Sequence, residues 1–336
     1  MKKILTISTL AILLVGAVLS GCVGNKNSDQ PAEMPNASGT PVASEKEKIE
    51  GTIKLSGAFA LYPMVVTWAD EYTKLNPNVR IDVSAGGAGK GMTDVLGGLV
   101  DIGMLSRDIS SSEVDKGAYA IAVTEDAVVP VINKNNPVYD DIMKKGINKT
   151  TLANIYLYST VKTWGEVVGR PEIKDEIHVY TRSDSAGAAD TWAKYLGDKK
   201  QDSLKGIGVN ADPGVLTAVQ KNPLGIGYNN FNYAFDNKTG QSVSGVYVVS
   251  FDVNNNGIVD PTEDISTKEK TIAAIKAKTF PHPPARVEFF VTKGKPSGIT
   301  ADFIRWVLTD GQKYVDSTGY VELPKETLDT ELKKVE

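Results

Sequence analysis

The chain has 336 residues, 41% hydrophobic and 23% charged, which is enough apolar material for a buried core and about two domains. The chain has 37 Lys and Arg and 41 Asp and Glu, so its formal net charge is -4. Because it also lacks a long basic run, a nucleic-acid-binding surface is not expected. The only cysteine, Cys22, lies near the start of the chain and the sequence has two histidines. The domain that follows is therefore not expected to contain a disulfide framework, a catalytic thiolate or a Cys or His zinc cluster.

Residues 1–21 have the pattern of an export signal peptide. Lys2 and Lys3 precede an apolar run that ends in the small residues of "LSGC". This ending resembles a bacterial lipobox, which predicts cleavage before Cys22 and a lipid on its thiol. The alternative is an uncleaved membrane anchor, since the run is near the lower limit of about 17 residues for a membrane span. Residues 22–48, rich in Asn, Ser, Pro, Ala and Lys, are predicted to form a flexible tether between the membrane and an extracytoplasmic domain.

Strands alternate with helices in the first part of the folded chain. The residue patterns predict, in order, strand 51–57, helix 61–75, strand 79–87, helix 89–99 and strand 100–105. Pro63 fits the first turn of its helix. This alternation predicts an α/β fold with a mixed, mostly parallel sheet and helices on both faces. Ligands of such sheets usually bind beyond the carboxyl ends of the strands, here the turns after Gly57 and Gly86.

A second region begins after the long apolar run 120–134, which predicts a crossing between two lobes. We assign 49–126 and 251–336 to the first lobe and 127–250 to the second. The alternative is a single multilayer domain. The later predicted elements are strand 177–184, helix 188–196, a helix, turn and strand within 211–235, strand 285–294 and a helix pair within 299–320.

Three turns rich in small residues precede predicted helices: "SGAFALYP", "SAGGAGKGM" and "SDSAGAAD". Helix N-termini leave backbone N-H groups unpaired and carry a partial positive charge, so three such ends predict a site for a small oxyanion. Arg182 would add a forked pair of donors, and Asp184 would orient it. The alternative is three ordinary strand-helix turns with Arg182 in a surface salt bridge.

Most of the chain, from 51 to 323, resembles the phosphate-binding proteins of ABC importers. The resemblance rests on the order of "GAFALYPMVVTWADEY", "VDIGMLSRDI", "IYLYSTVKTWGEV", "TRSDSAGAADTWAKYL", "GIGYNNFNYAF" and "GQKYVDSTGY". It implies a two-lobed periplasmic-binding-protein-like fold of type II, with inorganic phosphate held in the cleft between lobes and then passed to a membrane permease. We expect the protein to be a monomer.

The resemblance places the ligand contacts at ten positions: Phe59, Ala60, Ala88, Ser106, Arg182, Asp184, Ser185, Ala186, Gly187 and Ala188. The family usually carries Thr at the position of Phe59, Ser at that of Ala88, and Ser and Thr at those of Ala186 and Ala188. It also has an acceptor Asp at the position of Ser106, which selects protonated phosphate over sulfate. Other tetrahedral oxyanions, such as sulfate, molybdate or tungstate, and a ligand-free surface or sensor protein therefore stay open as alternatives.

The segment "DVNNNGIVDPTE", 252–263, fits the twelve-position calcium loop D-x-[DN]-x-[DN]-G-x5-E at every specified position. It predicts a structural calcium ion, and the alternative is an Asn-rich surface turn. The ligands would be Asp252, Asn254, Asn256, the Ile258 carbonyl, Asp260 and Glu263.

An enzyme is not expected, because the chain has no "GxSxG" elbow and no Walker loop.

Overall fold

The computed structural model describes residues 49–336. The predicted signal peptide at 1–21, the tether at 22–48 and the lipidation site Cys22 lie outside the described residues. Within the described part, no helix is both long and apolar enough to span a bilayer.

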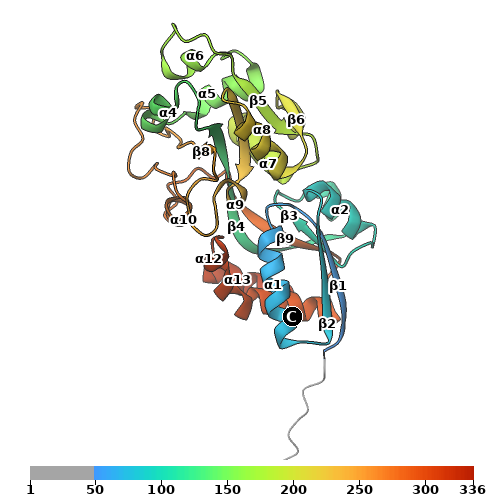
Figure 1. Cartoon of the computed structure of the whole chain (residues 1–336). Helices are drawn as coiled ribbons and strands as arrows, with labels where there is room; N and C mark the ends of the chain where they lie inside the picture. The colour runs from blue at the N-terminus through green and yellow to red at the C-terminus, as the bar shows by residue number, and fades with distance from the viewer. Residues whose placement is uncertain (1–48) are drawn as a thin grey trace, which may run out of the picture. The chain divides into compact units, whose positions relative to one another are not determined.

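The strands join into one path of β2, β1, β3, β9, β4, β7, β5 and β6, with β8 pairing to β4 (Figure 1). Their bounds are β1 Gly51–Gly57, β2 Val79–Ala85, β3 Ile102–Leu105, β4 Ala118–Asn133, β5 His178–Arg182, β6 Ile207–Val209, β7 Gly225–Asn230, β8 Val246–Val248 and β9 Ala285–Lys293. The predicted α/β class is confirmed. The sheet is less parallel than expected, because the long strands β4 and β9 run antiparallel to their neighbours.

The first lobe has the predicted strand-helix repeat. β1 lies between β2 and β3, parallel to both. Helices α1 (Tyr62–Leu75) and α2 (Ala88–Leu96) follow β1 and β2, and Pro63 is in the first turn of α1 as predicted. Trp68 of α1 is fully buried against Phe290 of β9, with ring centroids 5.8 Å apart. The remaining helices of this lobe are α3 Ser111–Val114, α11 Gly298–Leu308, η3 Asp310–Tyr314, α12 Val315–Thr318 and α13 Lys325–Lys333.

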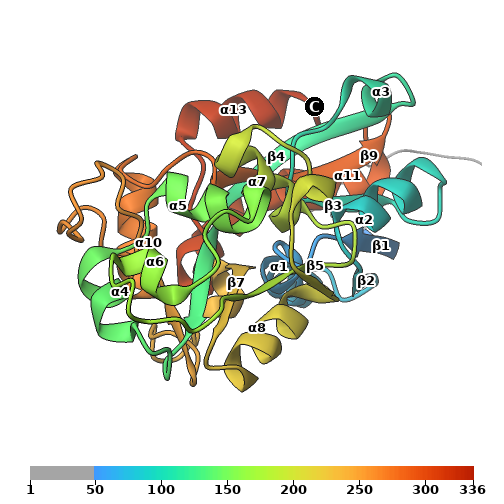
Figure 2. The same ribbon diagram turned by 90° about the horizontal axis from the view of Figure 1, so that it is seen from above.

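The second lobe is built on β5, β6, β7 and the far half of β4. Helices α7 (Gly187–Gly197) and α8 (Ala211–Lys221) lie on opposite sides of β5 and β7 (Figure 2). Trp192 of α7 stacks on Tyr228 of β7 at the centre of this lobe's core, with 5.5 Å between ring centroids. The other helices are α4 Tyr139–Lys145, α5 Lys149–Ala153, η1 Asn154–Tyr158, α6 Trp164–Val168, η2 Gln201–Ser203, α9 Phe231–Ala234 and α10 Lys268–Lys276.

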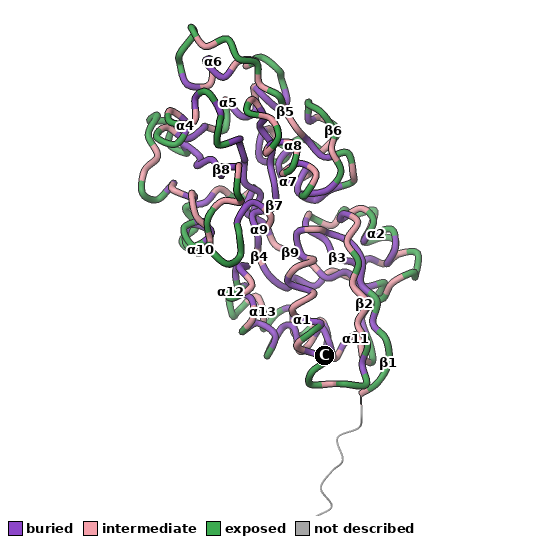
Figure 3. Tube along the Cα trace, viewed as in Figure 1, coloured by how far each residue is buried: buried purple, intermediate pink, exposed green. Residues whose placement is uncertain are grey.

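Two strands, β4 and β9, connect the lobes. They pair antiparallel over most of their length, with Asp126 opposite Arg286 in the register. Figure 3 shows buried backbone continuing along both strands from one lobe into the other. The buried side chains nevertheless form two separate cores, which supports two lobes over a single multilayer domain.

The return to the first lobe occurs later than the sequence division at 251. Phe251, Ile265, Ile275 and Phe280 belong to the core of the second lobe, and the first-lobe core resumes at Phe290. The physical reason is that the apolar side chains of α10 and its flanks are buried in the same hydrophobic cluster as those of β4 and β8, before β9 returns the chain to the first lobe.

Candidate anion-binding site

The three turns predicted to bind an anion all precede helices that have no side-chain cap. The residues that precede these helices are Leu61 for α1, Gly87 for α2 and Ala186 for α7, and none has a side-chain oxygen that accepts from the first helical N-H groups. By contrast, Asn148, Thr163 and Thr267 cap α5, α6 and α10 through their side chains. No side-chain cap therefore occupies the first N-H groups of these three helices, although the Gly89 N-H donates to the Ser185 carbonyl and the Ala186 N-H to Gln201 Oε1.

Two of these turns meet across the lobes. The Gly89 N-H of α2 donates to the carbonyl of Ser185 at 3.2 Å. A methyl group built on Gly187 would lie 2.5 Å from the carbonyl oxygen of Ser106, and one on Gly87 would lie 2.6 Å from that of Ser185. Glycine is required at these positions for the backbones to approach so closely. The turn 185–187 therefore lies against Ser106 and the start of α2.

Arg182 ends β5 beside this contact, and its guanidinium is almost completely buried. Nε donates to Asp184 Oδ1 at 2.8 Å and Nη2 to Asp184 Oδ2 at 2.5 Å, while Nη1 donates to Asp212 Oδ2 at 2.8 Å. A guanidinium has five N-H groups, so two donors remain for a ligand. Burial alone would lower the pKa of Arg182, but the Asp212 and Asp184 carboxylates outweigh it and raise the pKa. Arg182 stays charged, and Asp184 orients it as predicted.

The Phe59 ring packs against one face of the Arg182 guanidinium. Its ring centroid lies 5.5 Å from Arg182 Cζ, a cation-π contact between the first and second lobes. Its carbonyl accepts a hydrogen bond from the Tyr233 hydroxyl at 3.2 Å, and the Ala60 carbonyl accepts one from the Tyr320 hydroxyl at 2.5 Å. The turn before α1 is therefore held by Tyr233 of the second lobe and by Tyr320 of the first lobe.

The other predicted positions offer mainly backbone. Ala60, Ala88, Ala186 and Ala188 are buried and have only methyl side chains. Their contribution to a ligand would come from main-chain N-H groups. Ser106 is also buried and would add a hydroxyl from the first lobe.

Asp212, which was not predicted from the sequence, fixes Arg182 from the opposite side. This carboxylate is fully buried at the start of α8 and accepts from the Asn230 N-H at 2.9 Å and the Asn230 Nδ2 at 2.8 Å. The Asn229 side chain adds a longer contact of 3.5 Å. The available signal was an Asp in the first turn of a predicted helix, but its pairing with Arg182 is a tertiary contact.

Asn230 connects Asp212 to buried polar side chains on the two strands that join the lobes, and none of these contacts was predicted from the sequence. Its Oδ1 accepts a hydrogen bond from Nη2 of Arg286 on β9. Arg286 is buried, donates from Nε to Asp126 Oδ1 on β4 at 2.7 Å, and lies 3.2 Å from Glu288 Oε1. Buried hydrogen-bonded polar groups thus run without interruption from Arg182 to both strands that connect the lobes.

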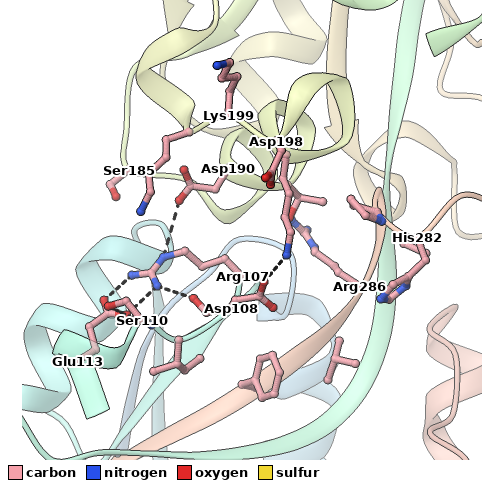
Figure 4. A pocket seen from close by; sticks show the side chains of 18 residues that line it. Arg107, Asp108, Ser110, Glu113, Ser185, Asp190, Asp198, Lys199, His282 and Arg286 are labelled. Atoms are coloured by element: carbon pink, nitrogen blue, oxygen red, sulfur yellow. Dashed lines mark hydrogen bonds and ion pairs between the residues drawn. The ribbon is translucent and has the colours of Figure 1, made fainter. Parts of the chain in front are cut away.

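A pocket with a volume of about 570 Å³ lies beside the Ser185 turn, and Arg182 is not among the residues that line it (Figure 4). Ser185 is the one predicted ligand residue that lines it. Arg107, which also lines this pocket, donates from Nη2 to Glu113 Oε1 at 2.7 Å and lies 3.8 Å from Asp190 Oδ2. Its charge is therefore already shared by two carboxylates.

The predicted calcium loop is folded around its own hydrogen bonds. Asp252 accepts from the Asn256 and Gly257 N-H groups at 3.0 and 3.1 Å, and Gly257 has φ +76°. Glu263 accepts from the Val253 N-H at 2.8 Å, and Asp260 accepts from the side chain of Asn256 at 3.0 Å. Among the described residues, no group of three His, Cys, Asp or Glu side chains is placed to hold a metal. The calcium ion therefore stays a prediction.

Comparison with known proteins identifies the fold family. Residues 42–311 match the family model for the PBP superfamily domain. The chain therefore belongs to the PBP superfamily, whose members have the two-lobed substrate-binding architecture described above.

Within that superfamily, the chain is similar to curated proteins named phosphate-binding protein PstS. It is 27% identical to the one from Bacillus subtilis over 322 residues, which cover 95% of this chain and 93% of the relative. It is also 27% identical to the one from Methanocaldococcus jannaschii, over 97% of this chain and 93% of that protein.

Two solved structures share the fold. One, from Clostridium perfringens, is assigned as a phosphate ABC transporter substrate-binding protein with bound phosphate; it has a TM-score of 0.65 and 22% identity and covers 82% of this chain and 100% of its own. The other is an ABC-type phosphate transport receptor from Vibrio cholerae, with a TM-score of 0.58, 20% identity and coverage of 81% and 100%. At this level of identity they establish the fold alone.

Proposed function

We propose that the chain is an extracytoplasmic solute-binding lipoprotein that captures inorganic phosphate for an ABC importer. The observation that carries the proposal is the meeting of uncapped helix starts from both lobes beside a buried, oriented arginine. Such a site offers several directed N-H donors and one fixed guanidinium, the donor set that suits a tetrahedral oxyanion. The names of the PstS relatives favour phosphate as that oxyanion.

The proposed ligand contacts keep the ten predicted positions and add Asp212 as a positioning residue. Backbone N-H groups at Phe59, Ala60, Ala88, Gly187 and Ala188 would bind the oxygens, together with the hydroxyls of Ser106 and Ser185. The Ala186 N-H would first have to leave Gln201 Oε1, to which it donates at 3.0 Å. Two free N-H groups of Arg182 would supply the charged contact. Because the ligand would touch both lobes, it should favour the closed arrangement through its higher affinity for that state.

Calorimetric titration of the purified full-length chain with phosphate tests this function. We expect saturable binding by the wild type and a loss of at least about 100-fold in affinity for Arg182→Ala. The matched control is Arg170→Ala, since Arg170 is an exposed arginine that also pairs with two carboxylates, Asp141 and Glu172. Circular dichroism checks that each variant is folded. Wild-type protein that binds no phosphate would contradict the proposal.

Another tetrahedral oxyanion is the second candidate, because side-chain hydroxyls are absent at Phe59, Ala88, Ala186 and Ala188. Sulfate, molybdate and tungstate in the same titration distinguish it from phosphate. If none of the four ions binds, the remaining candidate is a ligand-free surface or sensor protein on the same fold.

The lipid at Cys22 is part of the proposal and rests on the "LSGC" pattern. Mass spectrometry of the protein purified from membranes should find an acylated cysteine at the new N-terminus. A mature chain beginning elsewhere, or an unmodified Cys22, would exclude lipid anchoring at this residue.

The calcium ion is a separate proposal, supported by the twelve-position pattern and by the positive φ at Gly257. Calcium, but not magnesium, should raise the melting temperature of the wild type, and Asp252→Ala should abolish the rise. Asp236→Ala is the matched control, because Asp236 also accepts N-H groups within a surface turn. An equal response to calcium in wild type and Asp252→Ala would rule the site out.

A further inference from the structure

Two buried carboxylates, Asp126 of β4 and Glu288 of β9, form an acid pair where these strands cross between the lobes. The pair shares one guanidinium. Arg286 donates from Nε to Asp126 Oδ1 at 2.7 Å and from Nη2 to Asp126 Oδ2 at 3.1 Å, and Glu288 Oε1 lies 3.2 Å from the same Nε. Both carboxylates are fully buried, so solvent does not offset the excess of negative charge.

Glu288 is the member of the acid pair without donors. Among the described residues, neither of its oxygens accepts a hydrogen bond. An ionised carboxylate is strongly disfavoured in such a place. A proton on Glu288 removes this cost, because the carboxylic acid can then donate to the Asp126 carboxylate beside it. Burial and the Asp126 charge accordingly raise the pKa of Glu288 well above its usual 4.5, although Arg286 opposes the shift.

The titratable groups on the neighbouring elements do not neutralise the acid pair. These groups are two tyrosines, two further acids and one lysine: Tyr233, Tyr320, Glu125, Asp212 and Lys278. Tyr320 keeps its proton, since burial and then the two carboxylates of the pair raise its pKa. Asp212 and Glu125 add negative charge, and Lys278 acts on Glu125. Arg286 supplies the positive charge that acts on Glu288.

Hydrogen bonds connect the acid pair to the proposed anion site. Asp212 Oδ2 accepts from Arg182 Nη1 and from Asn230 Nδ2, both at 2.8 Å. Asn230 Oδ1 in turn accepts from Arg286 Nη2. All of these side chains are buried. A charge placed at Arg182 therefore acts on the acid pair across an interior in which screening by water and salt is weak.

Both lobes cover the acid pair. On the second-lobe side, Arg286 Nη1 donates to Thr191 Oγ1 of α7 at 3.1 Å. On the first-lobe side, Tyr320 lies near both acids, and its hydroxyl donates to the Ala60 carbonyl in the turn before α1. When the lobes separate, these covers move apart and water reaches the pair more easily. Closure therefore removes water from the two carboxylates.

From this arrangement we infer that the chain takes up a proton on the acid pair when phosphate binds. The inference rests on the proposed function, in which the anion lies at Arg182 between closed lobes. Two effects act in the same direction: the anion adds negative charge near the pair, and closure removes water from it. Both favour the protonated pair. Bound phosphate and the bound proton therefore stabilise each other, and each raises the affinity for the other.

Calorimetric titration of the full-length chain with phosphate, in buffers of different ionisation enthalpy, counts the protons taken up. The ionisation of phosphate itself is the same for wild type and Glu288→Gln, so the difference between the two proteins isolates the acid pair. We expect wild type to take up at least about 0.3 more protons per phosphate at its maximum between about pH 5 and 8. The ratio of wild-type to variant affinity should fall by at least about threefold over this range.

Glu322→Gln is the control, because Glu322 is an exposed glutamate. Its proton uptake should equal that of the wild type. Infrared difference spectroscopy provides a second readout, since the C=O stretch of a protonated carboxyl group is separated from the bands of carboxylates. Over the same pH range, phosphate should produce a new protonated-carboxyl band in wild type and in Glu322→Gln, and no such band in Glu288→Gln.

The outcomes separate the two proposals. Wild type that binds no phosphate overturns the proposed function and this inference together. Wild type that binds phosphate, but takes up no more protons than Glu288→Gln, overturns the inference alone. If Glu288→Gln does not fold, the wild-type infrared spectrum decides: phosphate binding without a new protonated-carboxyl band overturns the inference and leaves the proposed function intact.

Discussion

The single positive charge of Arg182 lies between two negative charges, the carboxylates of Asp184 and Asp212. The three side chains together are therefore not positively charged. The site therefore does not attract an anion through an excess of positive charge. Any affinity for an anion has to come from donors fixed in direction: the free helix N-H groups and the two remaining Arg182 N-H groups. Removing either carboxylate would leave part of the buried Arg182 charge without a partner, which is costly. This cost explains why both sides of the guanidinium are paired.

Buried Glu288 should make the free energy of unfolding depend on pH. Burial, and next to it the Asp126 carboxylate, raise the pKa of Glu288 well above its usual 4.5, although Arg286 opposes the shift. Between 4.5 and the raised pKa, the folded chain binds more protons than the unfolded chain, so the free energy of unfolding falls as pH rises. Glu288→Gln should remove this part of the fall and stabilise the protein more at pH 8 than at pH 5.

Urea unfolding at several pH values measures the effect. Glu322→Gln is the control, because Glu322 is exposed and should leave the pH dependence unchanged. If Glu288→Gln and wild type lose stability in parallel as pH rises, Glu288 is ionised in the folded state and our description of the crossing strands is wrong.

At the scale of elements, the helix starts divide into two kinds. α5, α6 and α10 begin with Asn or Thr side chains that satisfy their first N-H groups, whereas α1, α2 and α7 begin at Leu61, Gly87 and Ala186 without a cap. Losing a cap costs about 1 kcal/mol. The three helices that follow the predicted binding turns therefore all begin without this stabilisation, as do α4, α11 and α13 elsewhere in the fold.

The close approach of α7 to Ser106 makes Gly187 a test of closure. In Gly187→Ala, the new methyl group would lie 2.5 Å from the Ser106 carbonyl oxygen, so the lobes should be held apart. Such overpacking costs about 1–3 kcal/mol, and phosphate affinity should fall by about tenfold or more.

The control for this variant is Gly214→Ala within α8, where the added methyl group meets only ordinary contacts at 3.8 Å. There the affinity should stay at the wild-type value, and stability should rise slightly because alanine favours a helix. Titration calorimetry measures both variants. Unchanged phosphate affinity in Gly187→Ala would contradict the contact between α7 and Ser106 as part of the binding state.

At the scale of the whole molecule, the two lobes are bridged on both sides of the site. Lys194 Nζ lies 2.5 Å from Asp108 Oδ2, and Arg107 lies near Asp190, so charged pairs join α7 to the chain after β3. The hydroxyls of Tyr233 and Tyr320 join the second lobe and the C-terminal segment to the turn before α1. Together with β4 and β9, these contacts define the closed arrangement that a bound anion would favour.

The sequence predicted the alternation of strands and helices because that information is local: apolar periodicity, glycine-rich turns and Pro63. It also predicted Arg182 and Asp184, which are two residues apart. It could not predict Asp212, Asn230 or Arg286, because their partners are 30 to 160 residues away and meet only in the folded chain. The point at which the chain returns to the first lobe could not be predicted for the same reason. Phe251 and Ile275 belong to the second-lobe core because of tertiary packing, which local sequence does not show.

The most direct test of the proposed site is a crystal structure of the chain grown with phosphate. We expect tetrahedral density between the lobes, bonded to Arg182 and to N-H groups at the start of α7. Density only in the pocket beside Arg107 and Lys194, or no bound phosphate between the lobes, would contradict it.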